Sequence, residues 1–279
     1  MQFHPMKWLV YIVLAVTLPT SAFATNGSFL IGNGAKHRSI GGAGVALPLD
    51  STSSFINPAH AAHAGNGADL GLLLFFPERR ACTNTVPQCS ISGATEFAMP
   101  NMAFAMKFNR KVGIGMVFAP VAGGSTRYSD AIFETATQRT TGADLKQAVM
   151  APAVAYKVNK KFTVGVSPLI GIQAFRAYGL AVNFGPVSAD PANLSNTGND
   201  WSYGAGIRFG TLASFTNFNR GAAYSSRIYM PEFDNYRGLF SPNGEFDIPS
   251  HATIGIAIKP SKKMAIAFDV QRIWFNDVE

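Results

Sequence analysis

The stretch that decides the fold is SHATIGIAIKPSKKMAIAFDVQRIW, which runs from Ser250 to Trp274. Large apolar side chains occupy every second position of its two halves, and Lys259-Pro260-Ser261-Lys262 separates the halves. The apolar positions are Ile254, Ile256, Ile258, Met264, Ile266, Phe268 and Val270. Because successive side chains of a strand point to opposite faces, the pattern predicts a hairpin with one apolar face and one small or polar face.

The same alternation recurs along the chain, in pairs of segments that turns connect. We count nine strands: the two of the hairpin, an apolar run at 69–76, and three further pairs within 102–118, 151–170 and 201–230. Longer polar segments lie between the pairs, at 78–96, 121–143, 177–199 and 231–247. A soluble sandwich also alternates, but it has no reason to place its long loops on alternate connections. The pattern therefore favours an all-β fold, an outer-membrane β-barrel with short turns on one side and long loops on the other.

The first 24 residues have the features of a secretory signal peptide. Lys7 is their only formal charge, Trp8–Leu18 is an apolar core, and Ala22-Phe23-Ala24 fits an A-x-A cleavage site. An uncleaved N-terminal anchor is the alternative, although the apolar run is shorter than the roughly 20 residues of a membrane helix. We therefore divide the chain into a signal peptide at 1–24, a glycine-rich plug without sustained alternation at 25–67, and barrel strands at 68–279.

The composition is that of an exported, strand-rich protein. Charged residues are 14% of the chain, well below the roughly 25% of ordinary soluble domains. The net charge of +7 first suggests nucleic acid as a partner. However, the basic pairs Arg110-Lys111, Lys160-Lys161 and Lys262-Lys263 fall in turns between strands, where charges flank a membrane. We therefore expect no nucleic-acid partner.

The two cysteines, Cys82 and Cys89, lie seven positions apart in a polar loop. In an oxidising compartment they can form a local disulfide. Zinc binding is the alternative, but two cysteines without a nearby pair of histidines supply too few ligands. We expect a disulfide that staples the loop.

Residues that suggest catalysis or a cofactor lack the context that such chemistry needs. No Gly-Lys-Ser/Thr follows the glycine-rich stretch, and no Gly-x-Ser-x-Gly element is present. His60 and His63 suggest a metal site, but without a nearby carboxylate a polar plug surface is the simpler interpretation. Asp269 and Gln271, on the inward face of the hairpin, are expected to wet the lumen. We expect no enzyme activity, no cofactor and no metal.

A set of short motifs, spread in order over the chain, resembles a known family. The motifs are Ala24-Thr25-Asn26-Gly27, Gly34-Ala35-Lys36, Gly41-Gly42-Ala43-Gly44-Val45-Ala46-Leu47-Pro48, Asn57-Pro58-Ala59, Phe246-Asp247-Ile248-Pro249 and Phe268-Asp269-Val270-Gln271-Arg272. Together they resemble the outer-membrane long-chain fatty acid transporter family, the FadL, OmpP1 and TodX group.

The resemblance implies a 14-stranded barrel whose lumen is closed by an N-terminal hatch. It also implies passive transport of hydrophobic compounds, which are held in an internal apolar pocket and leave sideways through a gap in the wall. Asn57, Pro58 and Ala59 would belong to the hatch near that exit, where Pro58 fixes its own φ and biases Asn57 away from helix. An ordinary turn is the alternative for these three residues. His60 stands where the family commonly has glycine.

Ligand contacts are expected from the plug. Phe55 is a candidate for lining an apolar pocket, with simple packing as its alternative. Lys36 and Arg38 are candidates for binding a fatty acid carboxylate, with solvation at a surface as the alternative. The expected partners are the outer-membrane bilayer of a Gram-negative bacterium, hydrophobic small molecules such as fatty acids or aromatic hydrocarbons, and the barrel assembly machinery that inserts a Sec-exported protein. A complete barrel would be monomeric.

Two further expectations concern the chain as a whole. A structural or adhesive surface protein, binding ligands through its long extracellular loops, is the alternative to a transporter. Nine strands are also fewer than the family's 14, and bacterial single-chain barrels use an even number. Because an unpaired edge is not tolerated in hydrocarbon, we expect the chain ending at Asn276-Asp277-Val278-Glu279 to be a C-terminally truncated product.

Overall fold

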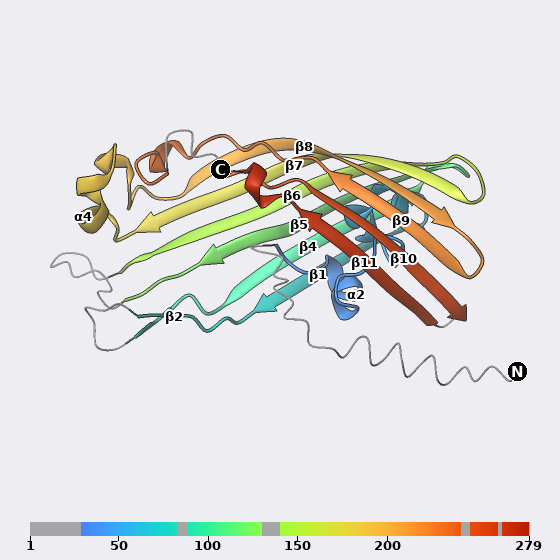
Figure 1. The fold of residues 1–279 in the computed structure, drawn as a ribbon, viewed down its shortest axis with the longest axis horizontal. Helices are drawn as coiled ribbons and strands as arrows, with labels where there is room; N and C mark the ends of the chain where they lie inside the picture. The colour runs from blue at the N-terminus through green and yellow to red at the C-terminus, as the bar shows by residue number, and fades with distance from the viewer. Residues whose placement is uncertain (1–28, 83–88, 130–139, 241–245, 262–263, 279) are drawn as a thin grey trace, which may run out of the picture.

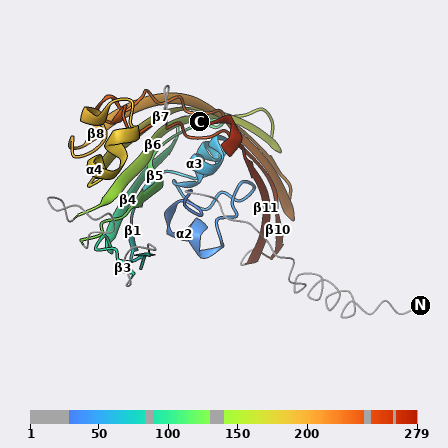
Figure 2. The same ribbon diagram turned by 60° about the vertical axis from the view of Figure 1, so that its left-hand side comes forward.

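The computed structural model describes residues 29–82, 89–129, 140–240, 246–261 and 264–278. Its main element is a nine-stranded antiparallel sheet that curves around an N-terminal segment (Figures 1 and 2). In sheet order the strands are β1 (Gly67–Phe75), β4 (Phe97–Lys107), β5 (Val112–Ser125), β6 (Gly142–Lys157), β7 (Phe162–Tyr178), β8 (Asp200–Ser214), β9 (Phe218–Ser225), β10 (His251–Ser261) and β11 (Met264–Ile273). The predicted number of strands is confirmed.

The wall has the polarity that the alternation predicts. In β4, Met102, Phe104 and Met106 are exposed, whereas Ala103 and Ala105 between them are buried. Large exposed apolar side chains recur on every second residue of β11, at Met264, Ile266, Phe268 and Val270, and in β1 at Leu70, Leu72 and Leu74. A soluble monomer rarely exposes so many apolar side chains together, so this outer face suits lipid.

The short connections that the structure describes, at 108–111, 158–161 and 215–217, lie at one end of the wall, and the long connections start from the other end (Figure 1). The turns at Asn109 and Asn159 have the same hydrogen-bond pattern. The Asn109 side-chain carbonyl accepts hydrogen bonds from the backbone N–H groups of Lys111 and Val112, both at 2.8 Å. The Asn159 side-chain carbonyl likewise accepts hydrogen bonds from the backbone N–H groups of Lys161, at 2.8 Å, and of Phe162, the first residue of β7, at 2.9 Å. The basic pairs at 110–111 and 160–161 therefore lie in turns as predicted, while Lys262 and Lys263 lie outside the described residues.

Several strands extend beyond the residues in which apolar side chains alternate with small or polar ones. β6 begins at Gly142, well before the predicted start at Ala151, and its partner β7 extends to Tyr178. The backbone ladder does not depend on the polarity of side chains, so pairing continues where polar residues such as Asp144 and Lys146 replace apolar ones. The long-loop segments predicted at 121–143 and 177–199 are correspondingly shorter.

The prediction of a strand reaching Met230 is wrong. β9 ends at Ser225, and the following segment turns inward, where Ile228 pairs with Ile248 through a single bridge. The buried Asp247 carboxylate accepts a hydrogen bond from the backbone N–H of Met230 at 2.5 Å and pairs with Arg227. Ile228 and Met230 are buried on the lumen side, whereas Tyr229 still pairs with Ala205 of β8 and is exposed.

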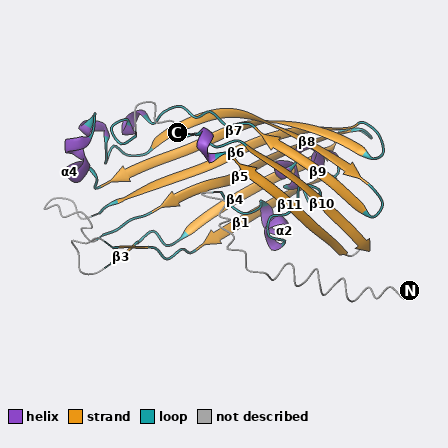
Figure 3. Cartoon of the chain, in the orientation of Figure 1, coloured by secondary structure: helices purple, strands orange, loops and turns teal. Residues whose placement is uncertain are grey.

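Helices occur in the N-terminal segment, in the long loops and after β11 (Figure 3). They are the α-helices α2 (Gly34–Ser39), α3 (Ser53–Ile56) and α4 (Ala181–Phe184), and the 3-10 helices η1 (Pro58–Ala62), η2 (Gly185–Val187), η3 (Pro191–Asn193), η4 (Asp234–Tyr236) and η5 (Phe275–Asp277). In the described part of the chain, none is long and apolar enough to cross a membrane.

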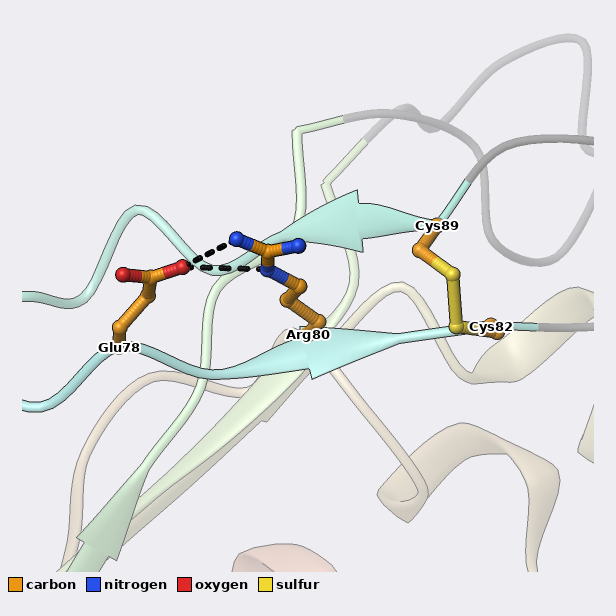
Figure 4. Close-up of a disulfide and its surroundings, with 4 residues drawn as sticks. All are labelled: Glu78, Arg80, Cys82 and Cys89. Carbon is orange, nitrogen blue, oxygen red and sulfur yellow. Dashed lines mark hydrogen bonds and ion pairs between the residues drawn. A yellow bond between two sulfur atoms is a disulfide. The ribbon is translucent and has the colours of Figure 1, made fainter.

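The first long loop contains a small hairpin of β2 (Arg80–Ala81) and β3 (Ser90–Ile91). Cys82 and Cys89 form a disulfide at its tip, with their Cα atoms 4.3 Å apart (Figure 4). An exposed ion pair between Glu78 and Arg80 lies at the base of the hairpin. The link holds together a two-stranded element that is too short to be stable alone.

We predict a depth-dependent penalty for arginine on the outer face of β7. Val166 and Phe162 are similarly exposed, at 37% and 38%, but Phe162 lies at the short-turn end and Val166 lies further into the wall. Val166→Arg should lower the free energy of unfolding in lipid by about 2–4 kcal/mol, and Phe162→Arg by about 0–1 kcal/mol. Urea titration in lipid vesicles measures both. Equal penalties would contradict a lipid-facing surface.

Candidate functional site

The N-terminal segment, residues 29–66, lies inside the curve of the sheet, and we call it the plug segment. Figure 2 shows α2 and α3 on the concave side of the curved sheet, between its two edges. α3 packs against β5 and β6, and η1 packs against β4 through β8. The backbone of Phe29 also pairs with Ala122 of β5. The predicted plug therefore contacts most of the wall from within.

The plug backbone rests on a row of residues that have almost no side chain. Gly113, Ala155, Gly165 and Gly210 lie opposite one another on adjacent strands β5, β6, β7 and β8. We call these four residues the glycine row. A Cβ atom at any of its three glycines would collide with the plug, at Ala61 and Ala62, at Pro58 and Ala59, or at Asn57. The close approach of η1 to the wall therefore requires glycine at these positions.

Asn57 links the plug to itself and to the wall. Its side chain is fully buried and uses both of its polar atoms. The Nδ2 group donates to the carbonyls of Val45 at 2.8 Å and Thr211 at 2.9 Å, and Oδ1 accepts from the N–H of Ala59 at 3.1 Å. The last bond caps η1, whose first residue is Pro58. The predicted Asn57-Pro58-Ala59 motif is thus a buried joint between the plug and β8.

Two carboxylates tie the plug to both edges of the sheet. Among the described residues, β1 and β11 each pair with one neighbouring strand. Asp69 of β1 accepts a hydrogen bond from the N–H of Ser51 at 2.9 Å. Asp269 of β11 accepts from the N–H groups of Gly44 at 2.7 Å and Val45 at 2.9 Å. Asp269 therefore does more than wet the lumen, because it holds the plug against the last strand.

A cavity of about 370 Å³ lies between the plug segment and the wall. Its apolar lining includes Phe29, Phe55, Val121, Leu169, Ile228 and Ile248. The polar side chains that reach it include Arg208, His251, Asp269 and Gln271. Polar and apolar groups line it in nearly equal measure, so its volume and lining suit a small ligand with both an apolar part and a polar group.

Arg208 is a buried cation that sequence reasoning missed. It lies on the inward face of β8 with 5% of its surface exposed. Its guanidinium donates to the Ser225 hydroxyl at 2.5 Å and to the Phe55 carbonyl, and it lies 4.6 Å from the centre of the Phe55 ring. Within the described residues, no ion pair joins it to a carboxylate. The sequence contains one signal of this site, an arginine at an inward position of a strand whose other residues alternate between apolar and small or polar.

The other ligand candidates from the sequence have different positions. Phe55 lines the cavity, as expected for a ligand contact, and also stacks under Arg208. Lys36 forms a 3.7 Å ion pair with Asp50, and its side chain is 59% exposed. Neither Lys36 nor Arg38 is among the residues that line the cavity. The cationic side chain that lines the cavity is Arg208, which belongs to β8 of the wall.

The two plug histidines differ in environment. The interpretation of His60 as part of a polar plug surface is wrong, because its side chain is fully buried. Burial, with the nearby His37 and His63, lowers the pKa of His60 to about 3, so its ring is neutral. His63 shares a 2.9 Å hydrogen bond with the Thr163 hydroxyl. The described residues contain no group of three or more His, Cys, Asp or Glu side chains that could hold a metal.

Comparison with known proteins identifies the family. A family model for outer membrane transport proteins of the OMPP1/FadL/TodX type matches residues 20–278. The chain belongs to this family. The resemblance seen in the plug and hairpin motifs is therefore confirmed, and the family is one of transporters in the outer membrane. A search of curated proteins found no match.

Solved structures of the family share the fold. The Pseudomonas putida toluene transporter TodX superposes with a TM-score of 0.67 at 17% identity, covering 89% of this chain and 72% of that one. A TodX deltaS2S3 mutant described as a monoaromatic hydrocarbon channel gives a TM-score of 0.69 at 17% identity, covering 88% and 71%. A Pseudomonas aeruginosa FadL homologue gives 0.56 at 13% identity, covering 84% and 67%.

We predict that a side chain in the glycine row displaces the plug. Gly210→Val places atoms where Asn57 and Pro58 lie, and overpacking of this kind costs about 1–3 kcal/mol. Gly124→Val, on β5, is the matched control because a Cβ there meets open space. Hydrogen exchange of plug peptides should quicken in the first variant alone. Equal exchange in the two variants would contradict a plug seated on this row.

Proposed function

We propose that the protein carries hydrophobic compounds passively across the outer membrane. The plug segment closes the lumen, and the cavity between plug and wall is the internal binding site. The observation that carries this proposal is the cavity itself, whose lining combines apolar side chains such as Phe29 and Leu169 with the buried Arg208 guanidinium. A channel for small polar solutes has no use for such a site, because its lumen is water-filled.

The preferred ligand is a long apolar molecule with one carboxylate, such as a long-chain fatty acid. A buried charge without an opposite charge is costly, and a ligand carboxylate supplies that opposite charge to Arg208. Arginine and carboxylate also match in geometry, since two parallel N–H groups can donate to two oxygens. The Phe29 and Phe55 rings would contact the apolar chain of the ligand.

Release requires the plug to loosen from the wall. We assign the gating role to Asn57, Pro58 and Ala59, because the Asn57 side chain joins the plug to the Thr211 carbonyl of β8. Arg208 links ligand and gate, since its guanidinium also donates to the carbonyl of Phe55 in α3. A ligand carboxylate that draws this guanidinium away would weaken one plug contact. Binding and gating are thereby coupled through one side chain.

The substrate class is tested by comparing a fatty acid with the alcohol of equal chain length. Hydrogen bonds to charged groups contribute about 1.5–3 kcal/mol, so Arg208→Gln should weaken binding of the acid about 10–100-fold. Binding of the alcohol should change far less, and the ratio of the two removes any effect of a looser plug. Arg237→Gln, an exposed loop residue paired with Asp190, is the control. Calorimetry or tryptophan fluorescence measures both ligands; equal losses would exclude carboxylate recognition by Arg208.

The gate is tested by Asn57→Asp, which keeps the acceptor for Ala59 and removes both donors. The new carboxylate would face two carbonyl oxygens, so we expect the plug to open. Whole cells should admit a small hydrophilic dye, and fatty acid uptake should lose saturation. Asn159→Asp is the matched control, because its hydrogen bonds in the turn use only the side-chain oxygen. Unchanged uptake and unchanged dye exclusion in Asn57→Asp would contradict the proposed gate.

A further inference from the structure

The short-turn end of the wall is strongly basic. In the described residues it is built from the stretches 107–112, 157–162, 214–220 and 259–261, and these contain no Asp or Glu. Their basic residues are Lys107, Arg110, Lys111, Lys157, Lys160, Lys161, Arg220 and Lys259. We call these eight residues the basic rim. The rim follows the curve of the wall from β4 to β10, at the end opposite α4 (Figure 1).

Charges at the long-loop end are arranged differently. There the acidic and basic side chains pair, as in Glu78–Arg80, Asp144–Lys146 and Asp190–Arg237. In the described ranges, no residue of the basic rim forms an ion pair with a carboxylate. The positive charge of the rim is therefore not neutralised by the protein itself.

Aromatic rings accompany these cations. The Lys111 ammonium lies 5.9 Å from the centre of the Tyr156 ring, and the Lys161 ammonium lies 5.7 Å from that of Phe215. Tyr156 is exposed on the outer face of β6, and Arg220 repeats the arrangement over Phe218. Outward rings at strand ends mark the depth of the lipid headgroups, and long basic side chains reach from there toward the headgroup phosphates.

We propose that the basic rim binds anionic phospholipid headgroups in the leaflet on the short-turn side of the outer membrane. In outer-membrane barrels this is the periplasmic side. Basic residues next to a membrane attract anionic lipids electrostatically. The phosphodiesters would lie between neighbouring turns, with their acyl chains against the apolar outer face. This inference does not depend on what the cavity binds.

The geometry favours lipid over an acidic protein partner. The Asn109 and Asn159 turns are short and hydrogen-bonded back to the strand ends, so they place their cations level with the rim. Arg110, Lys111, Lys160, Lys161 and Arg220 are spread along the curve of the wall, beside lipid-facing rings, whereas a protein contact would gather them into one patch. The other three rim residues, Lys107, Lys157 and Lys259, are at inward positions of their strands, near His63 of the plug. An annulus of headgroups matches this distribution in both charge and shape.

The test is lipid selectivity of the whole protein in nanodiscs of equal phosphatidylglycerol and phosphatidylcholine. Lipids retained after transfer to mild detergent are counted by native mass spectrometry. The native chain should retain phosphatidylglycerol about tenfold over phosphatidylcholine, and salt should reduce this preference. Reversing the charges of the turn residues Arg110, Lys111, Lys160 and Lys161 to Glu should abolish it.

The matched control reverses four basic residues at the long-loop end, Arg80, Lys146, Arg176 and Arg237, and should keep the preference. A milder double variant, Lys160→Gln with Lys161→Gln, should partly lower the preference for phosphatidylglycerol. It keeps the proposal testable if the variant with four reversed charges does not fold. No preference in the native chain, the result expected if the rim serves an acidic protein, would overturn the proposal. So would a preference that survives both rim variants.

Discussion

The close approach of the plug backbone to the inner wall is the constraint on which the rest of the structure depends. A backbone can lie directly against a sheet only where the sheet has no side chains in the way, and Gly113, Gly165 and Gly210 provide that gap. The same strands carry large apolar residues on their other face. Each strand therefore satisfies two opposite demands, bulk toward lipid and absence of bulk toward the plug, and the period of two makes both possible.

The position of the cavity depends on where the contact between η1 and the glycine row ends. η1 fills the lumen beside the glycine row, and the inward segment around Ile228 and Ile248 fills it further along. Asp247 fixes that second segment by binding the N–H of Met230. The space left between the two fillings is lined by both apolar and polar side chains, and Arg208 lies where plug and wall meet. A buried guanidinium satisfied only by neutral groups has the strongest unmet demand for an anion in this space.

The sequence predicts the wall well because alternation is a local property. The nine strands, the turns at Asn109 and Asn159, and the outward position of Phe268 all follow from it. Features that depend on distant contacts could not be predicted this way. Nothing near Met230 signals that Asp247 turns this segment inward, and an inward glycine such as Gly210 resembles any small residue until its partner is known. The plug motif around Asn57 was found by resemblance, while its bond to Thr211 required the structure.

The plug comes first in the chain, yet its final position is set by residues that come last. Its bonds to Asp269 span 225 and 224 positions, and the bond from Asn57 to Thr211 spans 154. These contacts cannot form before β8 and β11 exist, so the plug is seated after the wall strands have been made. Once seated, it joins β1 to β11 through Asp69 and Asp269, two strands that do not pair with each other in the described sheet. The element that closes the lumen is thus also a brace across the sheet, and a gating step must release Asn57 while these two carboxylates keep the plug attached.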